Sequence, residues 1–269
     1  MSFLRRYGPW AVVLGASEGL GQAFAHALAE RGLSVVVCAR RHEALRRVAD
    51  EIAHRHGVAT HPVQLDLADS AFLSVLSELT DGLDIGLVVY NGAAAYLGPL
   101  EDQSVDSIQS IVAVNCLGPA LVCHHFGRRF LRNGRGGIVL MGSAAGLAGS
   151  AYNAAYAASK AFDIVLGESL WSEWRSKGVD VLSVIGPAID TPNFRSMTPR
   201  GGKGLPTPLP PVLVANEVFD ALGSTPSFVP GLEVRQMLAQ LGGLPRRQQV
   251  EALSAAQAPL ADGSPTSHG

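Results

Sequence analysis

Three glycines near the start of the chain stand between an apolar run and a helical pattern. Residues 10–14 read Trp-Ala-Val-Val-Leu, and Gly15, Gly19 and Gly21 follow them. Behind these glycines, apolar residues recur at helical spacing until Gly32. Glycines at such a place allow a tight turn, let a pyrophosphate approach the backbone and direct the helix N-terminus at its negative charge. The pattern therefore predicts a nucleotide-binding strand–turn–helix unit. The alternative is a tight turn without a ligand.

The rest of the chain alternates between short apolar runs and helical segments. We predict strands at residues 10–14, 34–39, 58–65, 84–90, 137–142, 179–185 and 226–230. Helices are predicted at residues 19–31, 42–56, 69–79, 102–132, 153–177 and 212–222. Nearly continuous apolar strands separated by helices indicate an α/β fold of the Rossmann type, a doubly wound parallel sheet of about seven strands with helices on both faces. In such sheets the ligand lies beyond the carboxyl ends of the strands.

Length and composition suit one domain. The chain has 269 residues, of which 47% are hydrophobic and 16% charged, so it can bury one large core. Its formal net charge of -2 means that it has no excess of positive charge, such as proteins that bind nucleic acid carry. The cysteine count is odd, and Cys38, Cys116 and Cys123 stand in apolar surroundings, which favours free thiols and predicts a cytoplasmic protein. We expect one domain over residues 1–254 and a disordered tail over residues 255–269.

A tyrosine and a lysine stand four residues apart on one predicted helix. Tyr156 and Lys160 therefore share one face of that helix, one turn from each other. A fixed ammonium favours the phenolate form of a neighbouring phenol, so Tyr156 is a candidate proton donor and acceptor. The alternative is a chance pairing on a solvated helix.

Together, the glycine turn and the tyrosine–lysine pair resemble the short-chain dehydrogenase/reductase family. The resemblance runs from about Trp10 to Thr191 and implies a Ser–Tyr–Lys catalytic set with an assisting asparagine. The matching residues in this sequence are Asn115, Ser143, Tyr156 and Lys160. It further implies that Tyr156 transfers a proton, that Ser143 orients the reacting oxygen and that Lys160 holds the nicotinamide ribose. Asn115 would seat a water that links Lys160 to solvent.

The end of the second predicted strand bears on the choice of cofactor. NAD-using members of the family carry an acidic residue there, whereas this chain reads Ala39-Arg40-Arg41. An arginine pairs with a 2′-phosphate through its planar fork, so we predict NADP(H), with NAD(H) as the alternative. Glu18 in the glycine turn argues the other way, because many NADP-preferring relatives carry a basic residue there. Arg40 and Arg41 can also be read as ordinary solvated residues.

The resemblance assigns further residues to the cofactor. Asp66 resembles the aspartate that binds the adenine amino group, and residues 91–94 keep only part of the family's Asn-Asn-Ala-Gly motif. Gly186-Pro187 reverses a family Pro-Gly pair ahead of Thr191, which the resemblance places near the nicotinamide. The full predicted cofactor set is Gly15, Ser17, Glu18, Gly19, Leu20, Gly21, Arg40, Arg41, Asp66, Leu67, Asn91, Gly92, Ala93, Tyr156, Lys160, Pro187, Ile189 and Thr191.

Residues 191–211 are rich in proline and glycine and stand where the family keeps its substrate loop. The apolar residues of this segment favour a hydrophobic or aromatic ketone; the alternative is a plain surface connection. The predicted substrate contacts are Tyr96, Ser143, Leu147, Tyr152, Phe194 and Met197. Residues 232–254 predict a helix pair that covers the pocket, joins subunits or touches a lipid surface.

Other chemistries have weaker support. Ser17 in a Gly-x-Ser-x-Gly pattern formally matches a nucleophile elbow, but no triad acid and base stand out downstream. No spacing of histidine, cysteine and acidic residues predicts a metal site. The uncharged stretch 136–159 is interrupted by glycine, serine and asparagine, so it predicts a buried strand and a loop in place of a membrane span.

The sequence thus predicts an NADP(H)-dependent oxidoreductase that interconverts a ketone and a secondary alcohol on a small hydrophobic substrate by hydride transfer. We expect a homodimer or homotetramer. Two alternatives remain, a nucleotide-binding sensor or scaffold without turnover and an isomerase or lyase on the same fold. The altered motifs at Asn91 and Gly186 leave room for the sensor, whereas the complete serine, tyrosine, lysine and asparagine set favours the oxidoreductase.

Overall fold

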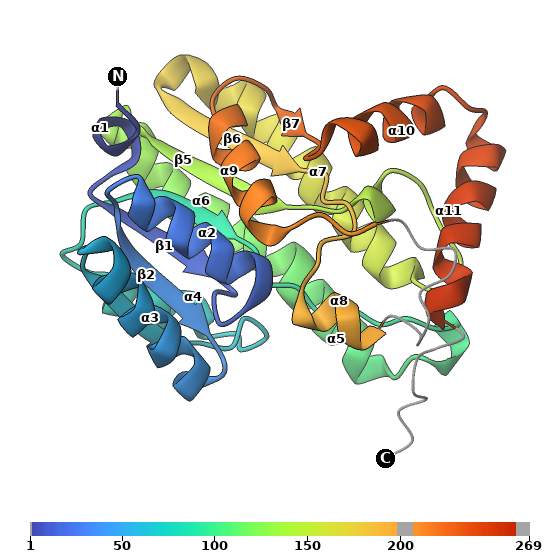
Figure 1. The fold of residues 1–269 in the computed structure, drawn as a ribbon, viewed down its shortest axis with the longest axis horizontal. Coiled ribbons are helices and arrows are strands. Elements are labelled where there is room, and N and C mark those ends of the chain that lie inside the picture. Colours follow the sequence, from blue (N-terminus) through green and yellow to red (C-terminus); the bar gives the residue numbers. More distant parts are fainter. Residues whose placement is uncertain (1, 198–206, 262–269) are drawn as a thin grey trace.

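The computed structural model describes residues 2–197 and 207–261 (Figure 1). One parallel sheet has the strand order β3-β2-β1-β4-β5-β6-β7. Its strands are β1 (Trp10–Leu14), β2 (Ser34–Ala39), β3 (Thr60–Gln64), β4 (Ile85–Tyr90), β5 (Gly136–Met141), β6 (Val179–Val184) and β7 (Ser227–Phe228). The helices are α1 (Phe3–Tyr7), α2 (Gly19–Glu30), α3 (His42–His56), α4 (Phe72–Leu79), α5 (Val105–Val112), α6 (Gly118–Asn133), α7 (Ala154–Trp174), α8 (Pro192–Met197), α9 (Pro211–Ala221), α10 (Leu232–Gly242) and α11 (Arg246–Ala261).

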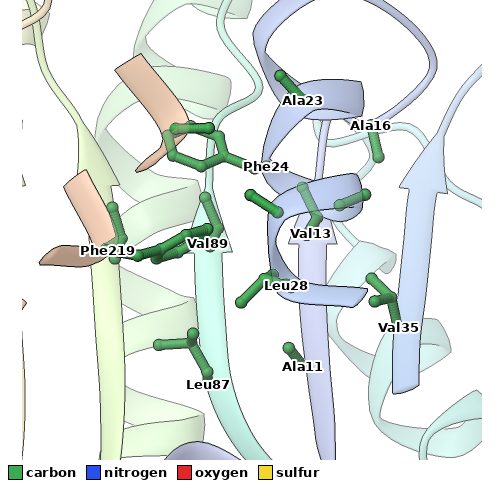
Figure 2. Packing of buried hydrophobic residues seen from close by; sticks show 14 of the residues in the cluster. Ala11, Val13, Ala16, Ala23, Phe24, Leu28, Val35, Leu87, Val89 and Phe219 are labelled. Atoms are coloured by element: carbon green, nitrogen blue, oxygen red, sulfur yellow. The ribbon is translucent and has the colours of Figure 1, made fainter. Parts of the chain in front are cut away.

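Neighbouring residues on each strand face opposite sides of the sheet, and both sides are buried. Val13 packs in one core with α2, α3 and α9, whereas the preceding Val12 packs in another with α4 and α6. Figure 2 shows the first core, where Phe24 of α2 lies against the sheet next to Phe219 of α9. Their rings meet edge to face with centroids 5.4 Å apart. The predicted doubly wound α/β fold is confirmed.

The strand order reverses between β1 and β4, and this reversal positions the site. From β1 the chain moves outward to β2 and β3, and it then returns to pair β4 with the other edge of β1. The crossovers leaving β1 and β4 therefore go to opposite sides and leave space between them at the carboxyl ends of these strands. The glycine turn follows β1 and Asn91 follows β4, so both lie at this edge.

Three element predictions need correction. The single helix predicted over residues 102–132 is α5 and α6 joined by η2 (Ala113–Leu117), a segment of π-helix. Residues 69–71 precede α4, because the Asp69 carboxylate accepts a hydrogen bond from Ala71 N in a local turn (2.8 Å). The predicted disordered tail is wrong for residues 255–261, which continue α11, since alanines and a glutamine there extend a helix readily. Residues 262–269 lie outside the described residues.

The α5–η2–α6 helix, Val105–Asn133, is long and apolar enough to cross a membrane by length and composition alone. In this fold its buried side chains, among them Phe126 and Phe130, pack on the sheet beneath β4, β5 and β6. Core helices of α/β proteins meet the same test, so the finding is weak support for a membrane span.

The N-terminal helix is held by a buried carboxylate at the start of β6. Asp180 accepts hydrogen bonds from Arg6 Nε (2.6 Å) and Nη2 (2.7 Å) and from the Tyr7 hydroxyl (2.6 Å). The carboxylate is 4% exposed and lies at the end of the sheet opposite to the glycine turn, because a parallel strand starts at the edge where its neighbours start. Asp180 is therefore a structural carboxylate with both oxygens paired.

Candidate active site

The glycine turn is closed by contacts that exclude side chains. Gly15 has a φ of 86°, and its carbonyl oxygen accepts a hydrogen bond from the Asn91 side-chain nitrogen (3.0 Å). A Cβ at Gly21 would overlap the Gly15 carbonyl oxygen. α2 begins at Gly19 directly after this turn, and no side chain caps its first N–H groups. The turn and the helix start thus form a backbone cradle suited to a pyrophosphate.

The departure from the family motif at Gly92 has a steric reason. A Cβ at this position would run into the Leu67 side chain, which packs from the loop after β3. An asparagine would not fit here without moving Leu67. The first asparagine of the motif, Asn91, keeps a structural role because it binds the glycine turn, so the altered motif still supports that turn.

An exposed ion pair occupies the predicted 2′-phosphate region. Arg41 Nη2 lies 2.6 Å from Glu18 Oε2 and 3.3 Å from Ser17 Oγ, which joins the start of α3 to the glycine turn. The two side chains are 58% and 43% exposed, so the pair can exchange partners with a ligand. Arg40 is also exposed. Asp66 uses one oxygen locally, accepting from Ala68 N (3.0 Å).

The predicted serine, tyrosine and lysine come together on β5 and α7. Ser143 follows β5, and its hydroxyl accepts a hydrogen bond from Ala145 N (3.2 Å) at the start of a short 3-10 turn. That turn packs directly on α7, because a Cβ at Gly146 would lie 2.6 Å from the Lys160 carbonyl carbon. Tyr156 is half-buried on α7, and Lys160 Nζ lies 5.9 Å from the centroid of its ring.

Lys160 is held from two sides. Its Nζ donates to the Met141 carbonyl oxygen (2.7 Å), at the end of β5, and to Asp163 Oδ2 (2.9 Å), one turn further along α7. Both charged side chains are 3% exposed. An ammonium has three N–H donors, and two of those of Lys160 are used within the described residues, so the third can serve a ligand.

Asn115 sits in the π-helical segment and joins three parts of the site. Its side chain pairs with both backbone groups of Ala94, each at 2.8 Å, and donates to the Ser159 hydroxyl (2.9 Å). Ser159 in turn donates to the Tyr156 carbonyl oxygen (2.7 Å). π-Helical turns occur often at functional sites. The Asn115 amide therefore fixes the loop after β4 against α7, and its predicted role in seating a water stays a prediction.

The predicted nicotinamide residues lie across the glycine turn. A Cβ at Gly19 would lie 3.0 Å from the Thr191 methyl carbon, so the segment after β6 meets the start of α2. The Thr191 hydroxyl accepts from Phe194 N (3.1 Å) and thereby caps α8. Ile189 pairs with Leu209 in an isolated parallel bridge. Pro187 is half-buried.

Four of the predicted substrate residues lie in or next to the loop between β5 and α7: Ser143, Leu147 and Tyr152 belong to it, and Tyr96 lies in a loop that is hydrogen-bonded to it. Tyr152 has a φ of 67°, a strained value for a tyrosine, and its carbonyl oxygen accepts from Gly98 N (2.6 Å) in the loop that carries Tyr96. Leu147 packs with Leu238 of α10. Phe194 is half-buried on α8, and the Met197 side chain lies outside the described residues.

The C-terminal helices cover this loop. Arg246 Nη1 donates to the Leu147 carbonyl oxygen (2.8 Å), and Ala151 N donates to Ser254 Oγ (3.0 Å). Figure 1 shows α10 and α11 together at one end of the molecule, far from α1. Of the three roles predicted for residues 232–254, the contacts support that of a cover over the loop after Ser143.

A profile of the short chain dehydrogenase family matches residues 9–201. The chain belongs to the short-chain dehydrogenase/reductase family. It is 31% identical over 234 residues to the 7β-hydroxysteroid dehydrogenase of Collinsella aerofaciens, covering 86% of this chain and 89% of that one. A solved structure from work on 7β-hydroxysteroid dehydrogenase stereoselectivity superposes with a TM-score of 0.89 at 28% identity, covering 94% and 99% of the two chains. A short-chain dehydrogenase from Sphingobium yanoikuyae in complex with NADPH gives 0.77 at 26% identity, with 91% and 95% covered.

These relatives establish the chain as a short-chain oxidoreductase, of a kind that acts on alcohol and carbonyl groups. Among the described residues, no group of three or more histidine, cysteine, aspartate or glutamate side chains could hold a metal ion.

Sequence reasoning missed two residues of this short-chain dehydrogenase site. Ser159 stands within the Tyr156–Lys160 segment, and Asp163 stands three residues after the lysine. The signal for Asp163 was present, because a carboxylate three residues from a lysine on an otherwise apolar helix is placed to pair with it.

Proposed function

We propose that the chain is an NADP(H)-dependent oxidoreductase that interconverts a ketone and a secondary alcohol on a hydrophobic substrate. The observation that carries the proposal is the grouping of Tyr156, Lys160 and the Ser143 turn on one stretch of α7, at the same edge of the sheet as the glycine turn.

The residues present fit a nicotinamide dinucleotide. The glycine turn and the start of α2 would hold its pyrophosphate, and the free donor of Lys160 would reach a ribose hydroxyl. No carboxylate ends β2, and Arg41 stands where a 2′-phosphate would be bound, which supports NADP(H) over NAD(H). The NADPH complex of the Sphingobium relative is in line with this choice.

The proposed chemistry couples a proton transfer to a hydride transfer. A reduced nicotinamide, when bound, supplies the hydride to the carbonyl carbon. Tyr156 donates its phenolic proton to the carbonyl oxygen as negative charge develops there, and the Ser143 hydroxyl donates a hydrogen bond to the same oxygen. The Lys160 ammonium stabilises the phenolate that remains. In the reverse direction the phenolate accepts the proton of the alcohol.

A bulky apolar substrate is the class that we favour. The predicted contacts on the loop after Ser143 are apolar or aromatic, and the C-terminal helices add Leu238 to them. The relative from Collinsella is named for a hydroxysteroid, and the likeness to it extends over most of both chains. We therefore propose a ketone or alcohol on a fused or aromatic ring system.

We further propose a cytoplasmic homo-oligomer. Five apolar side chains on neighbouring helices, α5, η2 and α7, are exposed: Val105, Val112, Leu117, Phe162 and Val165. Exposed apolar side chains on helices that pack against one another are a feature of protein interfaces, and a second copy of the chain is the occupant that we expect. Light scattering after size exclusion would return the monomer mass if this is incorrect.

The test of the proposed function is consumption of NADPH with a panel of carbonyl compounds. The panel should contain steroid ketones, aromatic and aliphatic ketones, 3-oxoacyl thioesters and aldoses. Tyr156→Phe removes only the hydroxyl, so we expect it to abolish turnover while NADPH still binds with nearly unchanged affinity. Retention of most of the rate in that variant would show that Tyr156 is not the proton donor. Binding of NADPH without consumption of any substrate would favour a sensor.

A further inference from the structure

A second buried carboxylate lies on the catalytic helix, and the proposed chemistry does not use it. Asp163 is 2% exposed, and its Oδ2 accepts from Lys160 Nζ at 2.9 Å. Its other oxygen, Oδ1, has no hydrogen-bond partner among the described residues. Asp163 is also fixed by its backbone, since its carbonyl oxygen accepts from the Ser183 hydroxyl of β6 (3.0 Å).

The groups that face Asp163 from other elements carry no charge near neutral pH. They are Tyr90 at the end of β4, Cys116 of the π-helical segment and Cys123 of α6. Burial raises the pKa of each of these groups, and the Asp163 carboxylate raises it further. The Tyr90 hydroxyl is already used, because it donates to the Val114 carbonyl oxygen (2.6 Å). Lys160 is therefore the one charged partner of Asp163 in the described part of the chain.

Stability alone does not account for this carboxylate. A buried ion pair is often no more stable than apolar residues of similar volume, because both charges lose their hydration. A buried oxygen without a hydrogen-bond partner adds a further desolvation cost. Asp180 shows what a structural carboxylate looks like in this protein, since both of its oxygens are paired. Buried groups that face a catalytic cation at such cost are candidates for a functional role.

We propose that Asp163 is a positioning residue of the reaction, which fixes the Lys160 ammonium between α7 and β5 and supplies the negative charge that faces it. This inference rests on the proposed function. Burial raises the pKa of the Asp163 carboxyl, and the Lys160 ammonium acts against that rise. Each charge of the pair is therefore maintained by the other.

The direction of the effect follows from the sign of the charge. The Asp163 carboxylate offsets the positive charge that Lys160 places next to the Tyr156 ring. Ketone reduction uses a proton from the enzyme, so kcat/KM falls at high pH where the proton donor is lost. Removal of the carboxylate leaves the ammonium without its counter-charge, and uncompensated positive charge near a proton donor favours loss of the proton. The falling limb of the pH profile must then move to lower pH.

The experiment is the pH profile of kcat/KM for NADPH-dependent ketone reduction in the full-length chain. For Asp163→Asn, of the same shape without charge, we expect the falling limb to move down by about one pH unit or more. Asp163→Ser is smaller and also neutral, so it should move the falling limb in the same direction. This variant replaces Asp163→Asn in the experiment if the asparagine variant does not fold. Asp163→Glu retains the charge and should keep the limb close to that of the unchanged protein.

Asp180→Asn is the matched control, because it also neutralises a buried carboxylate but lies away from the site. It should lower the thermal midpoint without moving the pH profile. If the neutral Asp163 variants lose stability in the same way and leave the profile in place, Asp163 is only structural and the proposal is overturned.

A second readout does not depend on turnover. The affinity for NADPH, followed by cofactor fluorescence across the same pH range, should fall as pH rises, and Asp163→Asn should bring this fall to lower pH. If no ketone is reduced but this shift is seen, the proposed function fails while the role of Asp163 stands. If the pH profiles of NADPH affinity and of kcat/KM are both unshifted in Asp163→Asn, the proposed role of Asp163 is overturned. If the unchanged protein does not bind NADPH, the proposed function and the role of Asp163 are both overturned.

Discussion

Arg41 offers the sharpest test of the cofactor choice, because its environment allows the effect to be bounded. We expect Arg41→Ala to weaken the binding of NADPH and to leave that of NADH nearly unchanged. A hydrogen bond between charged groups contributes about 1.5–3 kcal/mol. On binding, Arg41 gives up an exposed ion pair with Glu18, which is worth about 0–1 kcal/mol.

The difference leaves about 0.5–3 kcal/mol for the 2′-phosphate, which corresponds to a rise of about 2- to 150-fold in the dissociation constant of NADPH. NADH has no 2′-phosphate, so its constant should change by less than about twofold. Because the pair is exposed, the effect should shrink as salt is added. The assay is titration of each reduced cofactor by its fluorescence, at two ionic strengths.

Two further variants test this expectation, one as a control and one with the opposite expected effect. Arg47→Ala removes another exposed arginine of α3 and should change neither constant. Glu18→Gln frees Arg41 from its partner and removes a negative charge near the phosphate, so it should tighten NADPH binding, by up to about fivefold. Equal weakening of NADPH and NADH binding by Arg41→Ala would contradict this prediction, since Arg41 would then make no contact with the 2′-phosphate.

Two further predictions concern the glycine turn and the stability of the fold. Gly21→Ala should reduce the affinity for NADPH by about tenfold or more, because its Cβ would overlap the Gly15 carbonyl oxygen. Gly242→Ala is the control and should leave the affinity unchanged, because a Cβ there meets nothing within 4 Å. Both affinities can be measured by calorimetry. His26 Nδ1 lies 3.0 Å from His56 Nε2, and burial lowers the pKa of His26, so the unfolded chain binds this proton more tightly. The free energy of unfolding should therefore fall as pH drops below about 6.5. His26→Gln should make this dependence on pH weaker, as measured by urea titrations at several pH values. An unchanged dependence on pH would show that other groups cause it.

The local pattern of residues was sufficient to predict the helices and strands whose ends depend on residues adjacent in the sequence. The bounds of β1, β2 and α3 match those predicted, because apolar strand periodicity and the glycine after His56 are local signals. The π-helical turn in Val105–Asn133 was not predictable in this way, since residues of ordinary helical propensity form it. It lies where the Asn115 side chain binds Ala94 and Ser159, and these contacts join segments far apart in sequence.

The candidate site shows the same division. Ser143, Tyr156 and Lys160 could be predicted, because they belong to a motif with a characteristic spacing along the chain. The partners that hold these side chains come from elsewhere or were not part of a motif, as with the Met141 carbonyl for Lys160. The steric reason for Gly92 could not be read from the chain either, since it depends on where Leu67 packs.

Two cations of the candidate site, Arg41 and Lys160, each have a carboxylate partner, and their surroundings give the two pairs opposite properties. Arg41 and Glu18 form an exposed pair, which water and salt weaken, so a phosphate can displace the glutamate at little cost. Lys160 and Asp163 are both 3% exposed, and separating them would leave an uncompensated buried charge at a cost of about 3–5 kcal/mol. A ligand can therefore compete for Arg41 but must add to the contacts of Lys160, through the one donor left free. On this reasoning the first pair tunes which cofactor binds, and the second keeps the cation beside Tyr156 in place throughout the reaction.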